Sequence, residues 1–191
     1  MGAVMCATIA SCALAVPLLA AEVAAPRLHW ADASRKGVPF SKDPAVIRLR
    51  DRYLMYYSMP PATDPAAAPG WGIGIAESTD LVDWRKVGEL PPAGGCEAKG
   101  RAAPAAIVLD GTVHLFFQTY GNGPRDAICH AVSTDGVRFD RDPTNPVFRP
   151  TGEWNSGRAI DAEVYPHCDR LLLWFATRDP DSKTQMLGVA A

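Results

Sequence analysis

The stretch APAAIVLDGTVHLFF, residues 103–117, has two apolar runs on either side of an Asp-Gly pair. An Asp-Gly pair between apolar runs is a strong signal for a tight β-hairpin. The same fifteen-residue pattern occurs twice more, as DPAVIRLRDRYLMYY from Asp43 and as DAEVYPHCDRLLLWF from Asp161. In each copy, a turn separates the two runs and the second run ends in paired aromatic residues. The chain therefore repeats one hairpin at spacings of 60 and 58 residues.

The second run of each hairpin is apolar at consecutive positions, over residues 53–57, 113–117 and 171–175. This pattern predicts strands covered on both faces, as in sheets stacked face to face. GIGIAESTDLVDW from Gly72 and AICHAVSTDGVRF from Ala127 follow the first two hairpins and share an A-x-S-T-D pattern. Each is expected to add a strand, a turn and a final strand. Four-stranded units at a fixed period predict an all-β fold, a β-propeller.

The third unit stops early, because LGVAA from Leu187 matches IGIAE from Ile73 and the sequence ends where the S-T-D turn would follow. Residues 26–191 therefore predict an incomplete propeller domain of about two and a half blades. An open ring exposes the flank of its last blade, and exposed flanks favour association. We expect either a fragment of a longer chain or a chain that needs a partner to close the ring.

Composition narrows the class of protein. The 191 residues are 48% hydrophobic and 21% charged, with a net charge of −2, which predicts a soluble globular domain with no membrane span and no nucleic-acid partner.

Residues 1–25 are apolar and end in small residues, which indicates a signal peptide and a secreted or periplasmic protein. The alternative is a lipoprotein signal leading into Cys12. Without this segment Cys96, Cys129 and Cys168 remain, enough for one disulfide at most, and no C-x-x-C motif indicates a metal or redox site.

Four segments together resemble a known group of enzymes. SKDPAVIRLRDRYLMYYS, IAESTDLVDW, APAAIVLDGTVHLFF and GRAIDAEVY are similar, in this order, to the first three blades of the five-bladed β-propeller glycoside hydrolases, family 43 and its relatives, including family 117. The likeness covers residues 38–191. It implies that Asp43, in its D-P dipeptide, is the general base. It also implies that Asp161 positions the general acid and tunes the pKa of that acid.

The same resemblance places the general acid on a Glu that opens the fourth blade, beyond residue 191. Two departures bear on the match: Ala102 stands where many members have Trp, and Ala162 stands where Pro is usual. No cofactor and no metal ligand is assigned, although a Ca²⁺ on the propeller axis stays open. The expected partner is an oligosaccharide or polysaccharide, and the sequence leaves the oligomeric state open.

The repeat gives an independent reason to select these acids. The innermost strand of every blade lines the central funnel, so equivalent positions in different blades meet around one cavity. Asp43 and Asp161 occupy the same repeat position, and Ala103 occupies it in the second copy. If the acid only formed a turn, the second copy would be expected to carry one too. The alternative, in which Asp43 and Asp161 are structural residues at strand entries, stays open.

Four further residues are candidates for substrate binding. Glu163 lies two positions after Asp161 and faces the same side of a strand, as a ligand for sugar hydroxyls or as a rival acid. Trp71 and Trp154 lie in Gly-rich loops that suit sugar stacking, and Arg158 suits a hydroxyl or carboxylate. Each also has a structural interpretation: an edge cover for the tryptophans and a surface ion pair for Arg158.

Other polar residues are assigned to the fold. Lys42 is expected on the strand face opposite Asp43, because neighbouring side chains on a strand alternate. His114 and His130 fall within apolar strands and are predicted to be packed with satisfied rings.

The sequence therefore favours an exported glycoside hydrolase that acts on plant or algal polysaccharide fragments by single-step inversion. Arabinose, xylose and galactose units are all compatible with it. A carbohydrate-binding propeller without catalysis is the alternative, and a protein-binding scaffold is a weaker third hypothesis. A Glu at the start of the next repeat would favour the enzyme.

Overall fold

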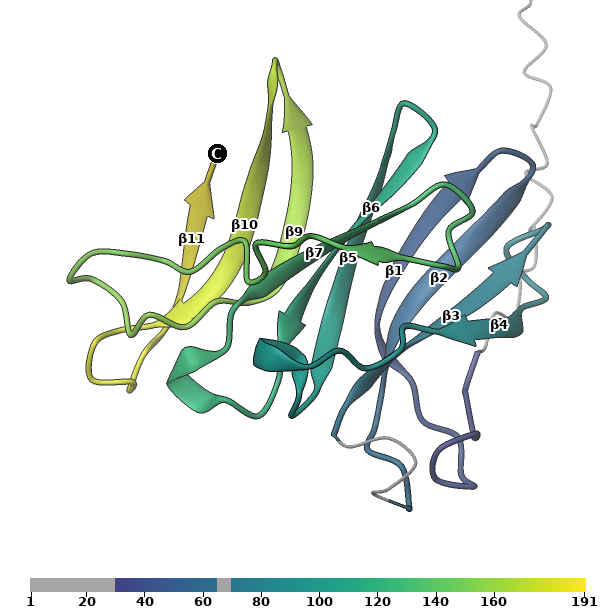
Figure 1. Ribbon diagram of the computed structural model, residues 1–191, viewed down its shortest axis with the longest axis horizontal. Helices are drawn as coiled ribbons and strands as arrows, with labels where there is room; N and C mark the ends of the chain where they lie inside the picture. Colours follow the sequence, from purple (N-terminus) through teal and green to yellow (C-terminus); the bar gives the residue numbers. More distant parts are fainter. Residues whose placement is uncertain (1–29, 65–69) are drawn as a thin grey trace, which may run out of the picture.

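The computed structural model describes residues 30–64 and 70–191, and almost all regular structure within them is antiparallel β-sheet (Figure 1). The predicted signal peptide lies outside the described residues. The described strands form two four-stranded sheets and one three-stranded sheet, here called blades 1, 2 and 3 in chain order. This confirms an all-β, propeller-type fold with two full blades and a shorter third.

Within each blade the strands lie side by side in chain order. Blade 1 consists of β1 (Lys42–Leu49), β2 (Arg52–Met59), β3 (Gly72–Ser78) and β4 (Arg85–Glu89). Blade 2 consists of β5 (Arg101–Leu109), β6 (Thr112–Thr119), β7 (Ile128–Ser133) and β8 (Asp140–Arg141). Blade 3 consists of β9 (Ile160–His167), β10 (Arg170–Arg178) and β11 (Gln185–Ala190). Two short 3-10 helices, η1 (Gly95–Glu97) and η2 (Gly123–Arg125), lie in the connecting loops.

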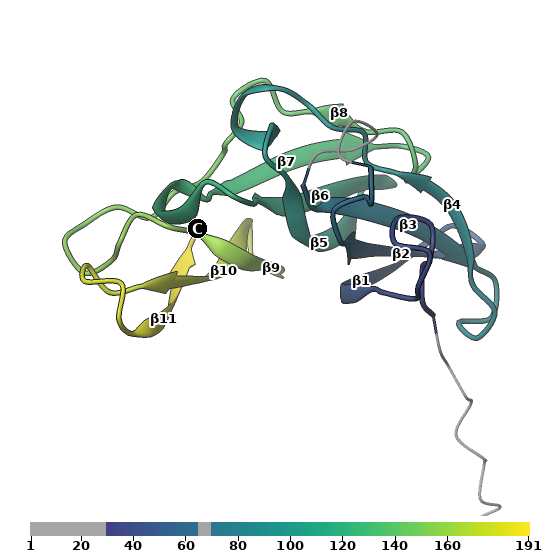
Figure 2. The same cartoon turned by 90° about the horizontal axis from the view of Figure 1, so that it is seen from below.

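The three hairpins form where the repeat predicts them. The turns contain Arg50, Asp110 and Cys168, whose φ values are all positive, at 59°, 48° and 55° respectively. Seen from below, the blades fan out from a common centre, with β1, β5 and β9 on the inner side (Figure 2). β5 contacts both β1 and β9. The first strands of the three blades are therefore neighbours, as the funnel argument requires.

The S-T-D segments form tight turns held by the aspartate. The carboxylates of Asp80 and Asp135 each accept two backbone N–H bonds from residues two and three positions ahead, which holds the pKa of both below its ordinary value. The following Gly136 has φ +71°, and its carbonyl accepts a 2.9 Å hydrogen bond from the Tyr56 hydroxyl. A Cβ at this position would lie 2.2 Å from Leu54 Cδ1, so glycine lets the blade 2 turn close over blade 1.

Two apolar cores join the blades. The larger core lies between blades 1 and 2, and a smaller one containing Ile128, Ala159 and Phe175 joins blades 2 and 3. On the outer face of blade 3, Trp174, Leu187 and Val189 are 49%, 78% and 51% exposed. The blade 1 residues at the same repeat positions are fully buried against blade 2: Tyr56, Ile73 and Ile75. Within the described residues, no blade packs against this face of blade 3, although the equivalent face of blade 1 is a packing surface.

Candidate active site

Three predicted acids line one cavity. Asp43 from the start of β1 and Asp161 and Glu163 from β9 surround a cavity of about 260 Å³. Ala103, from the start of β5 between them, lines it too, together with Pro44, Pro104 and Ala162. The structure therefore brings together residues of blades 1 and 3 that lie far apart in sequence. This is the convergence expected at a propeller funnel.

The backbone has the same unusual conformation at all three funnel positions. Asp43, Ala103 and Asp161 have φ values of +54°, +46° and +51°. The strand register also shifts at these positions, so that two residues of the first strand oppose one residue of the second. Such β-bulges redirect side chains and recur beside active sites, while positive φ is costly for residues other than glycine. Because Ala103 shares the conformation, the fold imposes it whether or not a carboxyl group is present.

Polar side chains of the preceding blade hold two of these bulges in place. The backbone N–H of Ala103 donates a 2.7 Å hydrogen bond to Ser58 Oγ on β2. The backbone N–H of Asp161 donates a bond of the same length to Gln118 Oε1 on β6. Ser58 and Gln118 are both buried. Each full blade therefore positions the funnel residue of the next blade.

The bulge also changes the environment of Asp43. Lys42 Nζ lies 3.0 Å from Asp43 Oδ2 and 4.9 Å from the ring centre of Trp71. The expectation that Lys42 and Asp43 lie on opposite strand faces is therefore wrong, because the bulge interrupts the alternation of side chains. Asp43 Oδ2 is buried, and within the described part of the chain its contact with Lys42 is an ion pair without hydrogen-bond geometry. A cation thus stands directly beside the predicted general base.

Asp161 is electrostatically coupled to this pair. Partial desolvation, and next the negative charge of Asp43, raise the pKa of Asp161 above its ordinary value, while Lys42 and Arg158 oppose the rise. Carboxyl groups that perturb one another in a shared cavity are typical of functional sites. Glu163 is exposed like Asp161 and lines the same cavity, whereas Val164 is buried. The cavity therefore holds two aspartates from different blades, and the pKa of Asp161 is raised in part by the charge of Asp43.

The other candidates lie outside this cavity. Trp71 packs against Phe40 and Tyr120, with ring centres 5.8 Å and 5.7 Å away, and Lys42, the partner of Asp43, lies over its ring. Trp154 is 42% exposed, with its ring 6.4 Å from that of Phe175. Neither tryptophan lines the acidic cavity. A role of these two side chains in sugar stacking therefore stays a prediction.

Arg158 points to a different partner. Its Nη2 lies 3.6 Å from Asp126 Oδ2, and the residue lines a separate cavity together with Arg178 and Ser182. Its charge opposes the rise in the pKa of Asp161. A substrate contact by Arg158 stays a prediction.

Sequence reasoning missed the two residues that anchor the funnel positions. Ser58 and Gln118 directly follow the paired aromatics of the first two hairpins, giving YYS and FFQ, whereas the third hairpin has Ala176 there. A polar residue at the end of an otherwise apolar strand is the signal that could have identified them. It indicates a buried hydrogen bond to an adjacent element.

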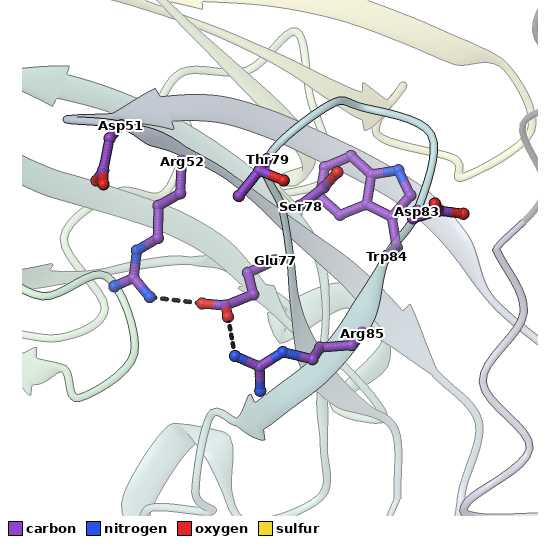
Figure 3. A pocket seen from close by; sticks show the side chains of 8 residues that line it. All are labelled: Asp51, Arg52, Glu77, Ser78, Thr79, Asp83, Trp84 and Arg85. Carbon is purple, nitrogen blue, oxygen red and sulfur yellow. Dashed lines mark hydrogen bonds and ion pairs between the residues drawn. The ribbon is translucent and has the colours of Figure 1, made fainter.

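A second cavity, on blade 1, contains arginine side chains beside its acidic residues (Figure 3). It is lined by Asp51, Arg52, Glu77, Ser78, Thr79, Asp83, Trp84 and Arg85. Glu77 bonds Arg52 at 2.5 Å through one oxygen and Arg85 through the other. Because two guanidinium groups occupy both oxygens, Glu77 is unsuited to act as an acid or base. The acidic cavity is therefore the better candidate for catalysis.

Two negative findings concern the described residues alone. Over residues 30–64 and 70–191, no group of three or more His, Cys, Asp or Glu side chains is arranged to hold a metal ion. Over the same ranges, no helix has the length and hydropathy needed to cross a membrane.

Comparison with solved structures shows the same fold. A family 117 glycoside hydrolase from Zobellia galactanivorans is 18% identical, with a TM-score of 0.58, over 78% of this chain and 52% of its own. A thermostable family-43 glycoside hydrolase is 17% identical, with a TM-score of 0.64, over 78% and 53%. The sucrose-6-phosphate hydrolase from Lactobacillus gasseri is 15% identical, with a TM-score of 0.64, over 78% and 31%. The chain thus spans from about 31% to about 53% of the length of these proteins.

No curated protein matches the chain. The family model described as glycosyl hydrolases family 32 N-terminal domain matches residues 40–187. The predicted resemblance to propeller glycoside hydrolases is therefore confirmed, whereas membership of family 43 in particular is not. With most of its length matched, the chain belongs to the family of glycosyl hydrolases family 32 N-terminal domains.

Proposed function

We propose that this chain supplies part of the active site of a glycoside hydrolase, with Asp43 and Asp161 as its carboxyl groups. One observation carries the proposal: acids from blades 1 and 3 line one cavity, and the equivalent blade 2 position is Ala103. The fold does not require an acid at this position, since Ala103 adopts the same backbone conformation. The family match supports the same reaction class.

Glycoside hydrolysis needs a carboxylate on one side of the scissile bond and a proton donor on the other. We assign the first role to Asp43. In single-step inversion, Asp43 takes a proton from a water molecule while the oxygen of that water attacks the anomeric carbon. The bond to the leaving oxygen breaks, and a general acid protonates that oxygen.

Asp161 is proposed to modulate the general acid. We place the general acid on a Glu beyond residue 191, with Glu163 as the candidate within this chain. A carboxylate at Asp161 would favour the protonated form of a neighbouring acid, as the charge of Asp43 already does for Asp161. The two catalytic carboxyl groups would be about 6.5–9.5 Å apart for inversion and about 5–5.5 Å apart for retention.

The substrate is proposed to be an oligosaccharide of plant or algal origin, met outside the cytoplasm. The names of similar proteins support a sugar substrate without selecting one, since they include a hydrolase from a marine bacterium and a sucrose-6-phosphate hydrolase. Inversion stays a prediction. Proton NMR of the first product formed distinguishes the two anomers and decides it.

The test uses the whole protein that contains this chain and a panel of aryl glycosides and oligosaccharides. Asp43→Asn is expected to lower kcat at least 100-fold, because general base catalysis contributes about 10²–10⁴-fold. The matched control is Asp51→Asn, in the exposed hairpin turn of the same blade. Unchanged turnover in Asp43→Asn would refute the proposal. Calorimetric binding of oligosaccharide with no turnover in the unaltered protein would favour a carbohydrate-binding propeller instead.

A further inference from the structure

Two cysteines from different elements are in contact beside the start of β5. Cys96 lies in η1, in the connection between blades 1 and 2, and Cys129 lies on β7 of blade 2. Their Sγ atoms are 3.6 Å apart, although the residues are separated by 33 positions. Both are free thiols, as is Cys168, which is exposed in the hairpin turn of blade 3.

We propose that Cys96 and Cys129 form a reversible disulfide that ties the connection between blades 1 and 2 to β7. A disulfide bond is about 2.0 Å long, so the two sulfur atoms need to approach by roughly 1.5 Å. Cys129 is fully buried on a strand, whereas Cys96 is partly exposed on a three-residue helix. We therefore expect Cys96 to make most of this movement.

The reaction is a thiol–disulfide exchange with a small disulfide oxidant such as oxidised glutathione. The Cys96 thiolate attacks the oxidant, which forms a mixed disulfide and releases one molecule of reduced glutathione. Cys129 then loses its proton and attacks the Cys96 sulfur, which forms the protein disulfide and releases the second glutathione. Two electrons pass from the two cysteines to the oxidant, and the two thiol protons are taken up by the released glutathione or by solvent.

The difference in burial between the two thiols determines which of them reacts first. Cys96 is the accessible thiol for the first attack, and Cys129 is shielded from the oxidant. Desolvation first, and then the proximity of Cys96 and Glu97, raise the pKa of the Cys129 thiol far above its ordinary value. Because the thiolate is the nucleophile, closure of the disulfide is expected to be slow at neutral pH and faster at alkaline pH.

The disulfide would hold a segment that leads into the funnel. Next to Cys96, the buried Glu97 bonds Arg141 of blade 2 at 2.9 Å, and the Glu97 carbonyl accepts a 3.0 Å bond from the Gly100 N–H. β5 starts at Arg101 and reaches the acidic cavity at Ala103. A cross-link here restrains the unfolded chain and fixes the entry to the middle strand of the cavity. This inference rests on the thiol geometry and is independent of glycosidase activity.

The experiment treats the folded chain with either oxidised or reduced glutathione, traps free thiols and maps its peptides by mass spectrometry. Oxidation is expected to yield one peptide pair linked through Cys96 and Cys129 and to raise the Tm by roughly 5–15 °C. Cys168→Ser, at the exposed turn, is expected to keep both effects. Cys96→Ser and Cys129→Ser are expected to lose both.

Three results would overturn the inference. The first is full alkylation of Cys96 and Cys129 after oxidation of the folded chain. The second is a linkage through Cys168 in place of this pair, and the third is a Cys96–Cys129 linkage that leaves the Tm unchanged. Because Cys129 is buried, Cys129→Ser could fail to fold. Cys96→Ser replaces a partly exposed side chain and tests the same bond without that complication.

Discussion

Gln118 on β6 accepts a 2.7 Å hydrogen bond from the backbone N–H of Asp161, which belongs to the next blade. The bond fixes the bulge from which the Asp161 side chain reaches the acidic cavity. Ser58 makes the equivalent bond to Ala103, where no carboxyl group is present. The two bonds therefore have the same structural role, but only the bond of Gln118 positions a residue with a carboxyl group.

Gln118→Met is expected to leave the Asp161 N–H without its acceptor at nearly constant side-chain volume. An unsatisfied backbone group of this kind costs about 1–3 kcal/mol of the free energy of unfolding. Under the proposed function, displacement of Asp161 is expected to lower kcat about 10- to 100-fold, because catalysis is sensitive to shifts of about 1 Å. Urea denaturation of the chain and steady-state kinetics of the whole protein measure the two effects.

The matched variant is Ser58→Ala, which removes the equivalent bond one blade earlier. A similar loss of stability is expected, with a smaller fall in kcat, because Ala103 carries no functional group. Equal kinetic losses in Ser58→Ala and Gln118→Met would contradict a positioning role for Gln118.

Asp161→Asn is expected to stabilise the chain at neutral pH. The pKa of Asp161 is raised in the folded state, chiefly by desolvation and then by Asp43. Its contribution to stability is therefore complete below the ordinary carboxyl pKa of about 3.9 and is lost as the pH rises through the raised value. Asn resembles the neutral acid at every pH, so the variant should have the higher urea midpoint at pH 7 and lose this advantage near pH 4.

The control for this pH series is Asp169→Asn, which alters a largely exposed aspartate in the hairpin turn of the same blade. It is expected to have no pH-dependent effect of this kind. A lower urea midpoint for Asp161→Asn than for the unaltered chain at pH 7 would show that the charged form of Asp161 is favoured instead.

His114→Leu is expected to reduce the sensitivity of the fold to mild acid. His114 Nδ1 lies 3.1 Å from His130 Nε2, and His130 Nδ1 lies 3.3 Å from Asp142 Oδ2. Desolvation, and then His130, lower the pKa of His114, so folding favours the neutral ring. This stability is complete above the ordinary pKa of about 6.5 and is lost as the pH falls through the lowered value.

Leucine is a natural replacement, since Leu54 occupies the same repeat position in blade 1. Between about pH 7.5 and pH 5.5, the unfolding free energy of His114→Leu should fall less than that of the unaltered chain. The exposed His167 supplies the comparison, because His167→Leu should leave the slope unchanged. Identical slopes in all three proteins would contradict the assignment.

Much of the fold was predictable because each hairpin contains its own local signals. The Asp110-Gly111 turn, the consecutive apolar positions and the repeated S-T-D segments each select a β conformation. Their common period then predicts that Asp43 and Asp161 occupy equivalent positions, and the structure places both in one cavity.

The details of the cavity were less predictable because they depend on departures from regular strand geometry. Alternation places Lys42 on the face opposite Asp43, and the bulge at Asp43 brings the two side chains together. The bond from Asp161 to Gln118 crosses between blades, so no local pattern contains it. Trp154 and Arg158 were selected for their chemistry alone, and their loops carry them to other surfaces.

Asp43, Ala103 and Asp161 share a positive φ, so the backbone shape of the funnel does not depend on which side chain occupies these positions. Since the backbone holds this conformation for an alanine as well as for an aspartate, a single substitution can add or remove a reactive group at the axis without remodelling a blade. Evolution can then diversify the reaction at little structural cost, which helps to explain how one architecture serves several hydrolase families.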